Sequence, residues 1–582
     1  MSRVGDSRYL WSHAAVAGLA VFCLAGATPP AEAPRLTVTL APARADGAGT
    51  VSYVDVTVRS DAERVDPGRP LLRLARVISN VATVADKVEG LSAADAKGPL
   101  DLTAKDEQGA EQTLWRRWYA NRPVDGQLTV HYRAPITNAL NPRGPAPPLE
   151  LRTEAGGFSG AGGAFLILPD TAAPHRLALH WDLAKLGPAA AGVSSLGAGD
   201  VSLAAAGGLA RLDEAYFMGG AIRRYPDPPG DGPFFAAWQG DPPFDGRALM
   251  QWTQALYGHY LGFFKPPGTP PYGVFLRRNL INPGGGVELG GSFVGTFGAD
   301  TQVQDLKLTL AHEMVHTFVG HFDGGDSLAG SWFSEGIAVY YQRVLPLRFG
   351  QISPDAFLAD LNWTAGRYYT DLMIGAPNDQ IPARFWADTR IRVLPYDRGS
   401  MYFAKVDEEV RKASHGARSL DDLILAMLDR RAHGQPMDQA AWVSVVTQAL
   451  GSRGKAEFDA MLAGQVVLPP SDSFGPCFER TTAPLQRYEL GFEPKVLTEP
   501  DRIVRDLITG SAAQRAGLRD GDRIAEPVGQ DHLQGEQQAV LTLHILRDGQ
   551  PLTIRYRPRG ETVQAYQWKR VASGASPTCG AL

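Results

Sequence analysis

One segment constrains the fold of this 582-residue chain more than any other: residues 312–316 read His-Glu-Met-Val-His. If the segment is helical, its two histidines lie one turn apart on the same face, and the apolar residues around them favour a buried helix. Eighteen residues (317–334) then precede Glu335, which lies in a second apolar segment, Trp-Phe-Ser-Glu-Gly at 332–336. We therefore expect two neighbouring helices, one carrying both histidines and the next carrying the carboxylate.

These three side chains are the ligands of a predicted metal site. The eighteen-residue spacing to Glu335 resembles that of the gluzincin metallopeptidases, and the resemblance implies that Glu335 joins His312 and His316 as the third ligand. Such a His₂Glu set with an open fourth position is the pattern of catalytic zinc sites, whereas structural zinc sites are closed and usually rich in cysteine. Glu313 projects toward the same side and is the candidate general base. We expect one Zn²⁺ per chain, and a polar helix face is the alternative explanation of the histidine pattern. His321 lies about 140° around the helix from His316 and is expected at the surface.

The length of the chain implies two to four domains. From residue 34 to about 230, short runs of alternating apolar and polar residues predict an antiparallel β domain. Helical periodicity begins near residue 247 and dominates from about 302 to 464, with a strand-like run at 274–276, which predicts an α+β domain at 231–472. After residue 470 the alternation at 541–545 matches that at 552–556 across a turn. Residues 477–579 are therefore expected to form a separate small domain.

The N-terminus is typical of a targeting signal. Two arginines, Arg3 and Arg8, precede a short apolar run at 14–27, which is shorter than the ~20 residues of a membrane-spanning helix. We predict a signal peptide at 1–27, with cleavage as late as residue 33, and a buried N-terminal helix is the alternative. The mature protein is expected to be exported, periplasmic or secreted, and to have no membrane span.

Charge and cysteine content limit the partners and the compartment. The formal net charge is −5 and no basic cluster is present, so the sequence gives no support for nucleic-acid binding. Cys477 and Cys579 remain after the signal is removed. They are candidates for a disulfide in an oxidising compartment, and two free thiols are the alternative.

The metal segment and three others together resemble the glycyl-aminopeptidase family of gluzincin metallopeptidases. These are relatives of the aminopeptidase N and leukotriene hydrolase group that carry a C-terminal PDZ domain. The first match is the metal segment, His-Glu-Met-Val-His-Thr-Phe followed by Trp-Phe-Ser-Glu-Gly. The second is Tyr-Asp-Arg-Gly at 396–399, similar to the family's Tyr-x-Lys/Arg-Gly. The resemblance implies that the Tyr396 hydroxyl stabilises the tetrahedral intermediate, and a core tyrosine is the alternative.

The third match is Gly-Gly-Val-Glu-Leu-Gly-Gly-Ser at 285–292, similar to the family's Gly-Gly-x-Glu-His-x-x-Ser. It implies that Gly285 and Gly286 let a substrate backbone approach an edge strand and that Glu288 holds the substrate's amino terminus. Leu289 replaces the family's histidine, which leaves the substrate preference open. A glycine-rich turn with a solvated glutamate is the alternative.

The fourth match is the PDZ signature. Gly-Ser-Ala-Ala-Gln-Arg-Ala-Gly-Leu at 510–518 is followed by Gly-Asp-Arg-Ile at 521–524. Upstream, Leu490, Gly491 and Phe492 stand where PDZ domains place their carboxylate-binding loop. The match implies a peptide or protein C-terminus as partner, or a module that serves in intramolecular packing or regulation.

The resemblance implies a multidomain α+β fold with three parts: an N-terminal antiparallel β domain (34–230), a thermolysin-like, mostly helical zinc peptidase domain (231–472) and a PDZ domain (477–579). It implies zinc-dependent hydrolysis of peptide substrates, with release of N-terminal amino acids. Two alternatives remain open: an endopeptidase on the same scaffold, and a PDZ adaptor or sensor with weak catalysis and a retained zinc site.

Overall fold

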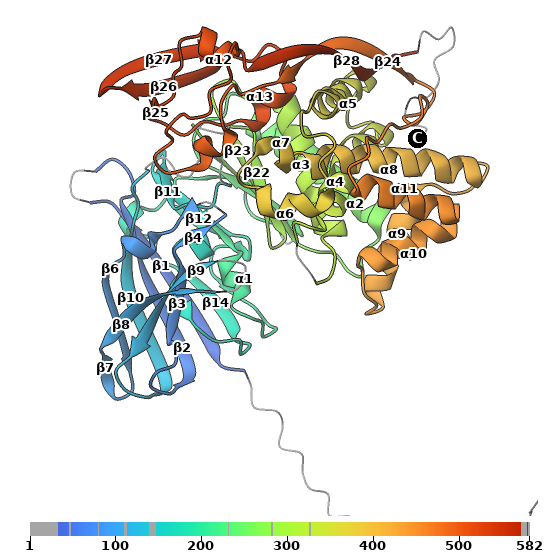
Figure 1. Cartoon of the computed structure of the whole chain (residues 1–582). Helices are drawn as coiled ribbons and strands as arrows, with labels where there is room; N and C mark the ends of the chain where they lie inside the picture. Colours follow the sequence, from blue (N-terminus) through green and yellow to red (C-terminus); the bar gives the residue numbers. More distant parts are fainter. Residues whose placement is uncertain are drawn as a thin grey trace, which may run out of the picture.

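The computed structural model of the chain (Figure 1) describes residues 33–45, 48–79, 81–109, 113–138, 147–230, 232–280, 283–324, 327–571 and 579. The predicted signal peptide at 1–27 lies outside the described residues. Figure 1 shows a β-rich part, coloured blue to cyan, beside a helical part coloured green to orange, with red C-terminal strands running across the helical part. This arrangement agrees with the predicted multidomain α+β class. None of the helices in the described ranges combines the length and apolar character needed to cross a membrane.

The largest N-terminal sheet follows the predicted alternation of apolar residues. Its strand order is β17-β14-β1-β2-β10-β6-β7. Leu36, Val38 and Leu40 of β1 (Arg35–Ala43) are completely buried, because every second side chain of the strand points into the core. The predicted domain was all antiparallel, but β1 pairs in parallel with β14 (Arg176–Trp181). A parallel pair needs a long crossover, and the chain supplies one between these two strands.

The described N-terminal part also contains sheets with the orders β11-β12-β18-β15-β16 and β13-β3-β9-β8, and the two-stranded sheet β4-β5. The remaining elements of this part are β2 (Tyr53–Val65), β3 (Leu72–Ala75), β4 (Val77–Ile78), β5 (Val81–Ala82), β6 (Glu89–Asp95), β7 (Gly98–Leu100), β8 (Leu102–Gln108), β9 (Leu114–Ala120), β10 (Val124–Pro135), β11 (Arg152–Glu154), β12 (Gly157–Ala161), β13 (Leu168–Pro169), β15 (Ala191–Ser194), β16 (Gly197–Ala198), β17 (Val201–Ser202), α1 (Ala210–Asp213) and β18 (Tyr216–Gly220).

A five-stranded sheet supports the helical part, in the order β19-β20-β21-β23-β22. The strands are β19 (Arg223–Tyr225), β20 (Phe234–Trp238), β21 (Tyr272–Arg278), β22 (Gly286–Leu289) and β23 (Ser292–Phe297). The predicted strand at 274–276 is confirmed as part of β21. The predicted boundary at residue 230 falls between β19 and β20, which pair with one another. β22 forms one edge of the sheet.

The helices of this part pack into one large core. They are α2 (Gly246–Phe264), α3 (Val303–Val319), α4 (Ser331–Arg348), α5 (Pro354–Tyr369), α6 (Ile381–Arg384), α7 (Thr389–Arg392), α8 (Leu394–Ala413), α9 (Leu420–Ala432), α10 (Gln439–Leu450) and α11 (Ser452–Leu462). Helix α9 begins with a capping box, in which the Ser419 side chain and Asp422 cap the first turn reciprocally.

Two glycines allow α4 and α8 to cross in close contact. A Cβ on Gly336 would lie 2.6 Å from the Cα of Gly399, and a Cβ on Gly399 would lie 2.4 Å from the carbonyl oxygen of Trp332. Only glycine fits on either side of such a crossing. The crossing brings Glu335, which precedes the first glycine, and Tyr396, one turn before the second, toward the same region.

The C-terminal part consists of a ribbon and a small module. The ribbon pairs β24 (Phe478–Tyr488) with β28 (Arg559–Arg570). The module contains β25 (Arg523–Ile524), β26 (Leu541–Arg547), β27 (Gln550–Tyr556), α12 (Ala512–Arg515) and α13 (Asp531–Gly535). The predicted hairpin is confirmed in register, since Leu541, Leu543 and Ile545 face Tyr556, Ile554 and Leu552.

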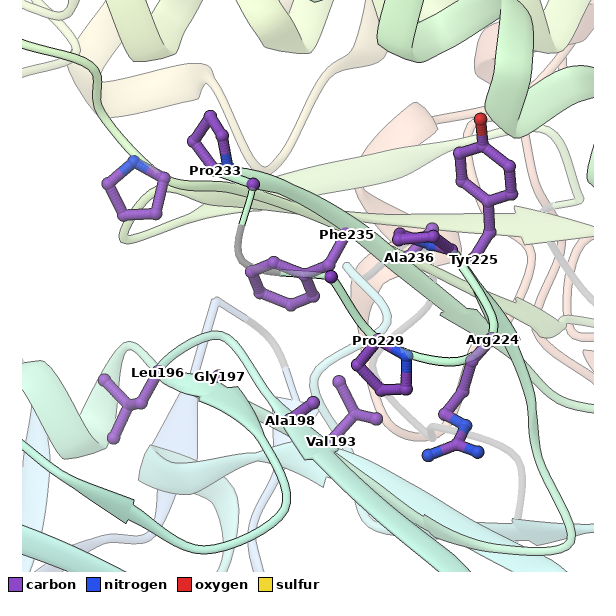
Figure 2. Close-up of a pocket in the computed structure, with 14 residues that line it drawn as sticks. Val193, Leu196, Gly197, Ala198, Arg224, Tyr225, Pro229, Pro233, Phe235 and Ala236 are labelled. Carbon is purple, nitrogen blue, oxygen red and sulfur yellow. The ribbon is translucent and has the colours of Figure 1, made fainter.

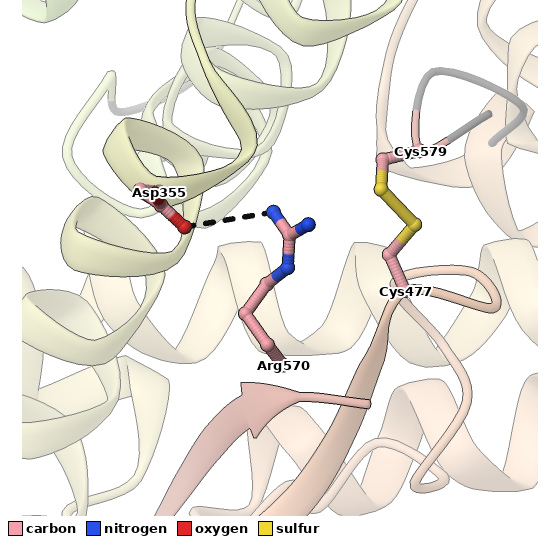
Figure 3. Close-up of a disulfide and its surroundings, with 4 residues drawn as sticks. All are labelled: Asp355, Cys477, Arg570 and Cys579. Atoms are coloured by element: carbon pink, nitrogen blue, oxygen red, sulfur yellow. Dashed lines mark ion pairs between the residues drawn. A yellow bond between two sulfur atoms is a disulfide. The ribbon is translucent and has the colours of Figure 1, made fainter. Parts of the chain in front are cut away.

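The two ends of the predicted 477–579 domain pack on the helical part. Phe478, Ala565 and Trp568 of the ribbon belong to the core of the helices, whereas the module has a separate apolar core. Figure 1 shows the ribbon beside α5. Cys477 and Cys579 form a disulfide at the end of the ribbon, with their Cα atoms 5.5 Å apart (Figure 3).

Replacing Cys477 and Cys579 by serine is expected to lower the melting temperature and to leave zinc stoichiometry unchanged. The bridge spans 102 residues, and the chain-entropy model assigns a loop of that length at most about 4–5 kcal/mol. Mass spectrometry of protein from an oxidising compartment checks the bridge itself. Finding both cysteines alkylatable in the native protein would rule it out and would weigh against export.

Candidate metal centre and cleft

The three predicted ligands converge on one point between two helices. His312 and His316 lie one turn apart on α3, and Glu335 lies in the first turns of α4. The Nε2 atoms of the two histidines are 3.2 Å apart. Glu335 Oε2 lies 3.2 Å from Nε2 of His312 and 3.4 Å from Nε2 of His316. Both histidines are buried.

This triangle has the dimensions of a tetrahedral zinc site. Ligand atoms at Zn–N and Zn–O distances of about 2.0–2.1 Å in tetrahedral geometry are about 3.3–3.4 Å from one another. The three measured separations, 3.2, 3.2 and 3.4 Å, agree with that value. Two imidazole lone pairs and a carboxylate at such distances repel one another unless a cation or protons lie between them. The donor set therefore fits Zn²⁺.

A neighbouring amide fixes the tautomer of one ligand. His312 Nδ1 lies 3.0 Å from Oε1 of Gln342, which can only accept, so Nδ1 carries the proton and Nε2 keeps its lone pair for a metal. The Nε2 amide of Gln342 donates to both carboxylate oxygens of Asp360, at 3.0 and 3.1 Å. This second contact holds the orientation of the Gln342 side chain.

The pKa values of the two glutamates at the metal centre, Glu313 and Glu335, are shifted in opposite directions. Burial raises the pKa of Glu313 to about 8, and the nearby Glu335 and Glu288 add to the rise. Burial also acts to raise the pKa of Glu335, but the adjacent His316 and His312 hold that pKa well below its usual range. Glu335 is thus favoured as an anionic ligand. Glu313 is the group of this pair that gains and releases a proton, and a bound cation would favour its ionised form.

Tyr396 lies against the ligand His312, and the two residues that follow it fix its position. Its ring stacks on that of His312, with centroids 6.0 Å apart and 16° between the planes. The next residue, Asp397, is completely buried and accepts hydrogen bonds of 2.8 and 2.6 Å from Arg367. Arg398 donates to the carbonyl oxygens of Ile374 and Ala376. The Asp and Arg of this motif therefore anchor the first turn of α8.

The edge strand β22 forms one wall of the site. The strand packs against the metal helix α3, and the backbone of Glu288 acts to lower the pKa of Glu313. The Glu288 carboxylate accepts from the Gly291 N–H at 3.3 Å, and its burial raises its pKa. Packing within the sheet also requires glycine at position 286, because a Cβ there would lie 2.1 Å from the Phe293 ring. Glu288 thus lies in a strand at the cleft and not in a solvated turn.

The site opens into a cleft with a volume of about 400 Å³. Its wall includes the five predicted polar residues of the metal centre with Glu288, Gly285 and Gly286. It also includes His321 and residues that the sequence did not single out: Ser79, Pro147, Pro148, Asn279, Val287, Thr296, Phe385, Trp386 and Arg392. His321 is exposed as expected, yet it stacks on His316 at a centroid distance of 5.6 Å. Sequence reasoning placed it correctly at the surface but missed the cleft.

A second cavity, of about 230 Å³, carries no comparable chemistry (Figure 2). Its lining is mostly apolar, with Val193, Leu196 and Phe235 among several prolines. Arg224 of the lining is paired with Asp227 at 3.1 Å. The cleft at the metal centre is therefore the candidate functional site.

No protein-family model matches this chain, and no curated protein matches it. Several solved structures, in contrast, are similar to this chain. An aminopeptidase N family protein from Idiomarina loihiensis aligns over 92% of this chain and 98% of its own, with a TM-score of 0.63 at 14% identity. At that identity the similarity establishes the fold alone.

Two other solved structures align less well. An M1 zinc metallopeptidase from Deinococcus radiodurans covers 75% of this chain and 95% of its own, with a TM-score of 0.46 at 16% identity. Native yeast LTA4 hydrolase covers 74% and 67%, with a TM-score of 0.44 at 12% identity.

The predicted PDZ loop is built into the module. Leu490 and Phe492 are buried in its apolar core, and the Gly491 carbonyl accepts from the N–H of Ile508 at 2.8 Å. PDZ domains bind peptides by adding them as a strand to an exposed sheet edge. Here the residues after the loop, Pro494–Thr498, form a 3₁₀ helix. Peptide binding at this loop stays a prediction.

Proposed function

We propose that this protein is a zinc-dependent peptidase that releases amino acids from the free amino ends of peptides. The observation that carries the proposal is the triangle of His312, His316 and Glu335, whose dimensions suit one tetrahedral Zn²⁺ beside an open cleft. The fold similarity described above agrees with it. Zinc at this position would supply Lewis-acid polarisation and lower the pKa of water.

The residues of the chain have separate tasks in this proposal. Glu313 takes a proton from the attacking water and returns it to the leaving amine. The hydroxyl of Tyr396 donates to the substrate's carbonyl oxygen as that oxygen gains negative charge. The free edge of β22 offers backbone groups to an extended substrate, and Glu288 accepts hydrogen bonds from its terminal ammonium.

The assay that tests the function compares matched peptides with free and acetylated amino ends, each with and without a chelator. We expect cleavage of the free peptides only, one residue at a time, and its loss on chelation. Comparable cleavage of the blocked peptides would favour the endopeptidase alternative. No cleavage of any aminoacyl substrate by the zinc-loaded protein would favour the adaptor or sensor.

Glu288→Ala is expected to impair selectively the substrates with a free amino end. The buried carboxylate is assigned to the ammonium, so its loss costs the charge-assisted hydrogen bond, about 1.5–3 kcal/mol or roughly 10- to 150-fold in kcat/KM. Glu288→Gln tests the role of the charge by itself, since the glutamine side chain has the same size as glutamate but is neutral. Equal losses on free and amino-blocked peptides would remove this assignment.

Tyr396→Phe is expected to lower kcat by roughly 10²- to 10³-fold with little change in KM, because its hydroxyl acts only in the transition state. The ring remains, so stacking on His312 and the metal content should persist. Steady-state kinetics with zinc analysis is the measurement. A change confined to KM would show that Tyr396 binds substrate and takes no part in charge stabilisation.

We also propose that residues 477–579 include a PDZ-type module that serves the enzyme within the same chain, and that the protein is exported. The buried loop at 490–492 and the ribbon packed on α5 support the first proposal. The disulfide between Cys477 and Cys579 supports the second, because such bridges persist in oxidising compartments.

A further inference from the structure

Helix α5 lies between the C-terminal ribbon and the supports of the metal centre, and it presents a different face to each. At 100° per residue, Asp355, Asn362 and Gly366 fall within about 40° of one another around the helix axis. Asp360, Thr364 and Arg367 fall within about 60° of one another on the opposite side. The first set contacts the ribbon, and the second contacts residues that support the site.

The ribbon face makes specific contacts with β28. The Asn362 amide donates to the carbonyl oxygen of Trp568 at 2.8 Å and accepts from its N–H at 2.7 Å. Gln567 donates to the Asn362 carbonyl oxygen at 3.3 Å. One turn on, Gly366 lies against Leu485 of β24. Near the start of the helix, Asp355 pairs with Arg570 at 3.5 Å (Figure 3).

The opposite face supports the metal centre through two side chains. Asp360 accepts from Gln342, whose oxygen orients His312. Arg343 donates to the same carboxylate, and to Thr364 at 2.7 Å.

The second support is Arg367, which holds Asp397 with two hydrogen bonds. Asp397 is completely buried beside Tyr396. One helix therefore orients a metal ligand and the catalytic tyrosine.

We propose that α5 couples the docking of the C-terminal ribbon to the catalytic centre, with Asp360 and Arg367 as positioning residues for His312 and Tyr396. An α-helix moves as a stiff element, so a shift on the ribbon face displaces the opposite face as well. Hydrogen bonds of 2.6–3.1 Å tolerate little displacement, and a misplacement of about 1 Å can lower a rate by ~10²-fold. The part of the inference that concerns turnover rests on the proposed peptidase function.

Two variants of full-length protein loosen the ribbon without altering the site face. Asn362→Asp places a carboxylate oxygen against the Trp568 carbonyl oxygen, and Asn362→Ala removes both side-chain hydrogen bonds. The matched control is Arg570→Gln, which removes an ion pair on the same helix face whose partners are 45% and 87% exposed and which is expected to matter little.

We expect both Asn362 variants to lower kcat about 3- to 30-fold and to leave KM within about twofold of the wild type. This loss is smaller than the one expected when a catalytic group is displaced by about 1 Å, because the helix is only loosened. We also expect faster zinc release, by about 3- to 10-fold, below the effect of removing an orienting partner outright. Hydrogen exchange should increase at 559–570 and also at 394–400. Arg570→Gln should match the wild type in each measurement.

Variants of Asp360 and Arg367, on the α5 face opposite the ribbon, distinguish the effect on the metal ligand from the effect on Tyr396. Asp360→Asn is expected to accelerate zinc release, because it acts through Gln342 on His312. Arg367→Lys is expected to lower kcat and leave zinc release unchanged, because it acts on the turn that carries Tyr396. A purely structural role would lower the melting temperature in each variant without this division.

The proposal is wrong if both Asn362 variants keep kcat and zinc release within about twofold of the wild type. It is also wrong if Asp360→Asn and Arg367→Lys lower the melting temperature but leave zinc release and kcat unchanged. A wild type that binds zinc but cleaves no peptide contradicts the proposed function instead. In that case zinc release and hydrogen exchange still decide whether α5 couples the ribbon to the centre.

Discussion

Glu313→Gln is expected to keep its zinc and nearly all of its stability while turnover falls by roughly 10²- to 10⁴-fold, the usual contribution of a general base. Glutamine has the shape of glutamate but cannot take the proton of the attacking water. The burial that raises the pKa of Glu313 to about 8 no longer penalises a charge in the variant. Single-turnover kinetics with metal analysis measures the effect.

The matched control is Glu89→Gln, an exposed glutamate at the start of β6 that is not among the residues lining the cleft. It should equal the wild type in kcat, KM and zinc content. Near-wild-type turnover by the Glu313 variant would show that another group activates the water.

His316→Ala is expected to reduce bound zinc well below one ion per chain after dialysis, with peptidase activity lost in proportion. Removing a ligand leaves two donors, so the loss of affinity should exceed the roughly 10- to 100-fold that follows the loss of a residue that only orients a ligand. The apolar residues around His316 on α3 keep their packing, so the helix should persist. Metal analysis by mass spectrometry is the measurement.

His433→Ala serves as its control, because that side chain is 69% exposed just beyond α9. It should retain one zinc per chain. Unchanged zinc content in the His316 variant would refute the ligand assignment, whatever happened to activity.

The ligand set could be predicted from the sequence because its pattern is local. Two histidines four residues apart must share a helix face, and the next apolar segment supplies Glu335. Strand β1 and the β26–β27 hairpin were predictable for the same reason, since alternation within a few residues decides which side chains are buried. Strand β21 was predictable from a short continuous apolar run, which suits a strand that is buried on both faces. The parallel pairing of β1 with β14 depends on strands far apart in the sequence and left no local signal.

The supports of the site could not be predicted in this way. Gln342, Asp360 and Arg367 are ordinary polar residues in helical patterns, and only the packing of α4, α5 and α8 brings them to His312 and Asp397. His321 shows the same limit, because its exposure was predictable but its position at the cleft was not.

The glycines illustrate how a correct motif can have an additional cause. Gly286 was expected to be glycine so that a substrate backbone could approach, but the Phe293 ring alone excludes a side chain there. Gly336 and Gly399 drew attention only as parts of motifs. Their contact allows α4 and α8 to cross closely enough for Glu335 and Tyr396 to reach one centre.

Titration of metal-free protein with zinc, followed by cleavage of a tripeptide with a free amino end, tests the central claim most directly. We predict that activity rises linearly and stops at one equivalent of zinc per chain, with release of the first residue, and that chelation reverses it. Full activity in the metal-free protein would contradict the account, and so would one bound zinc that confers no cleavage.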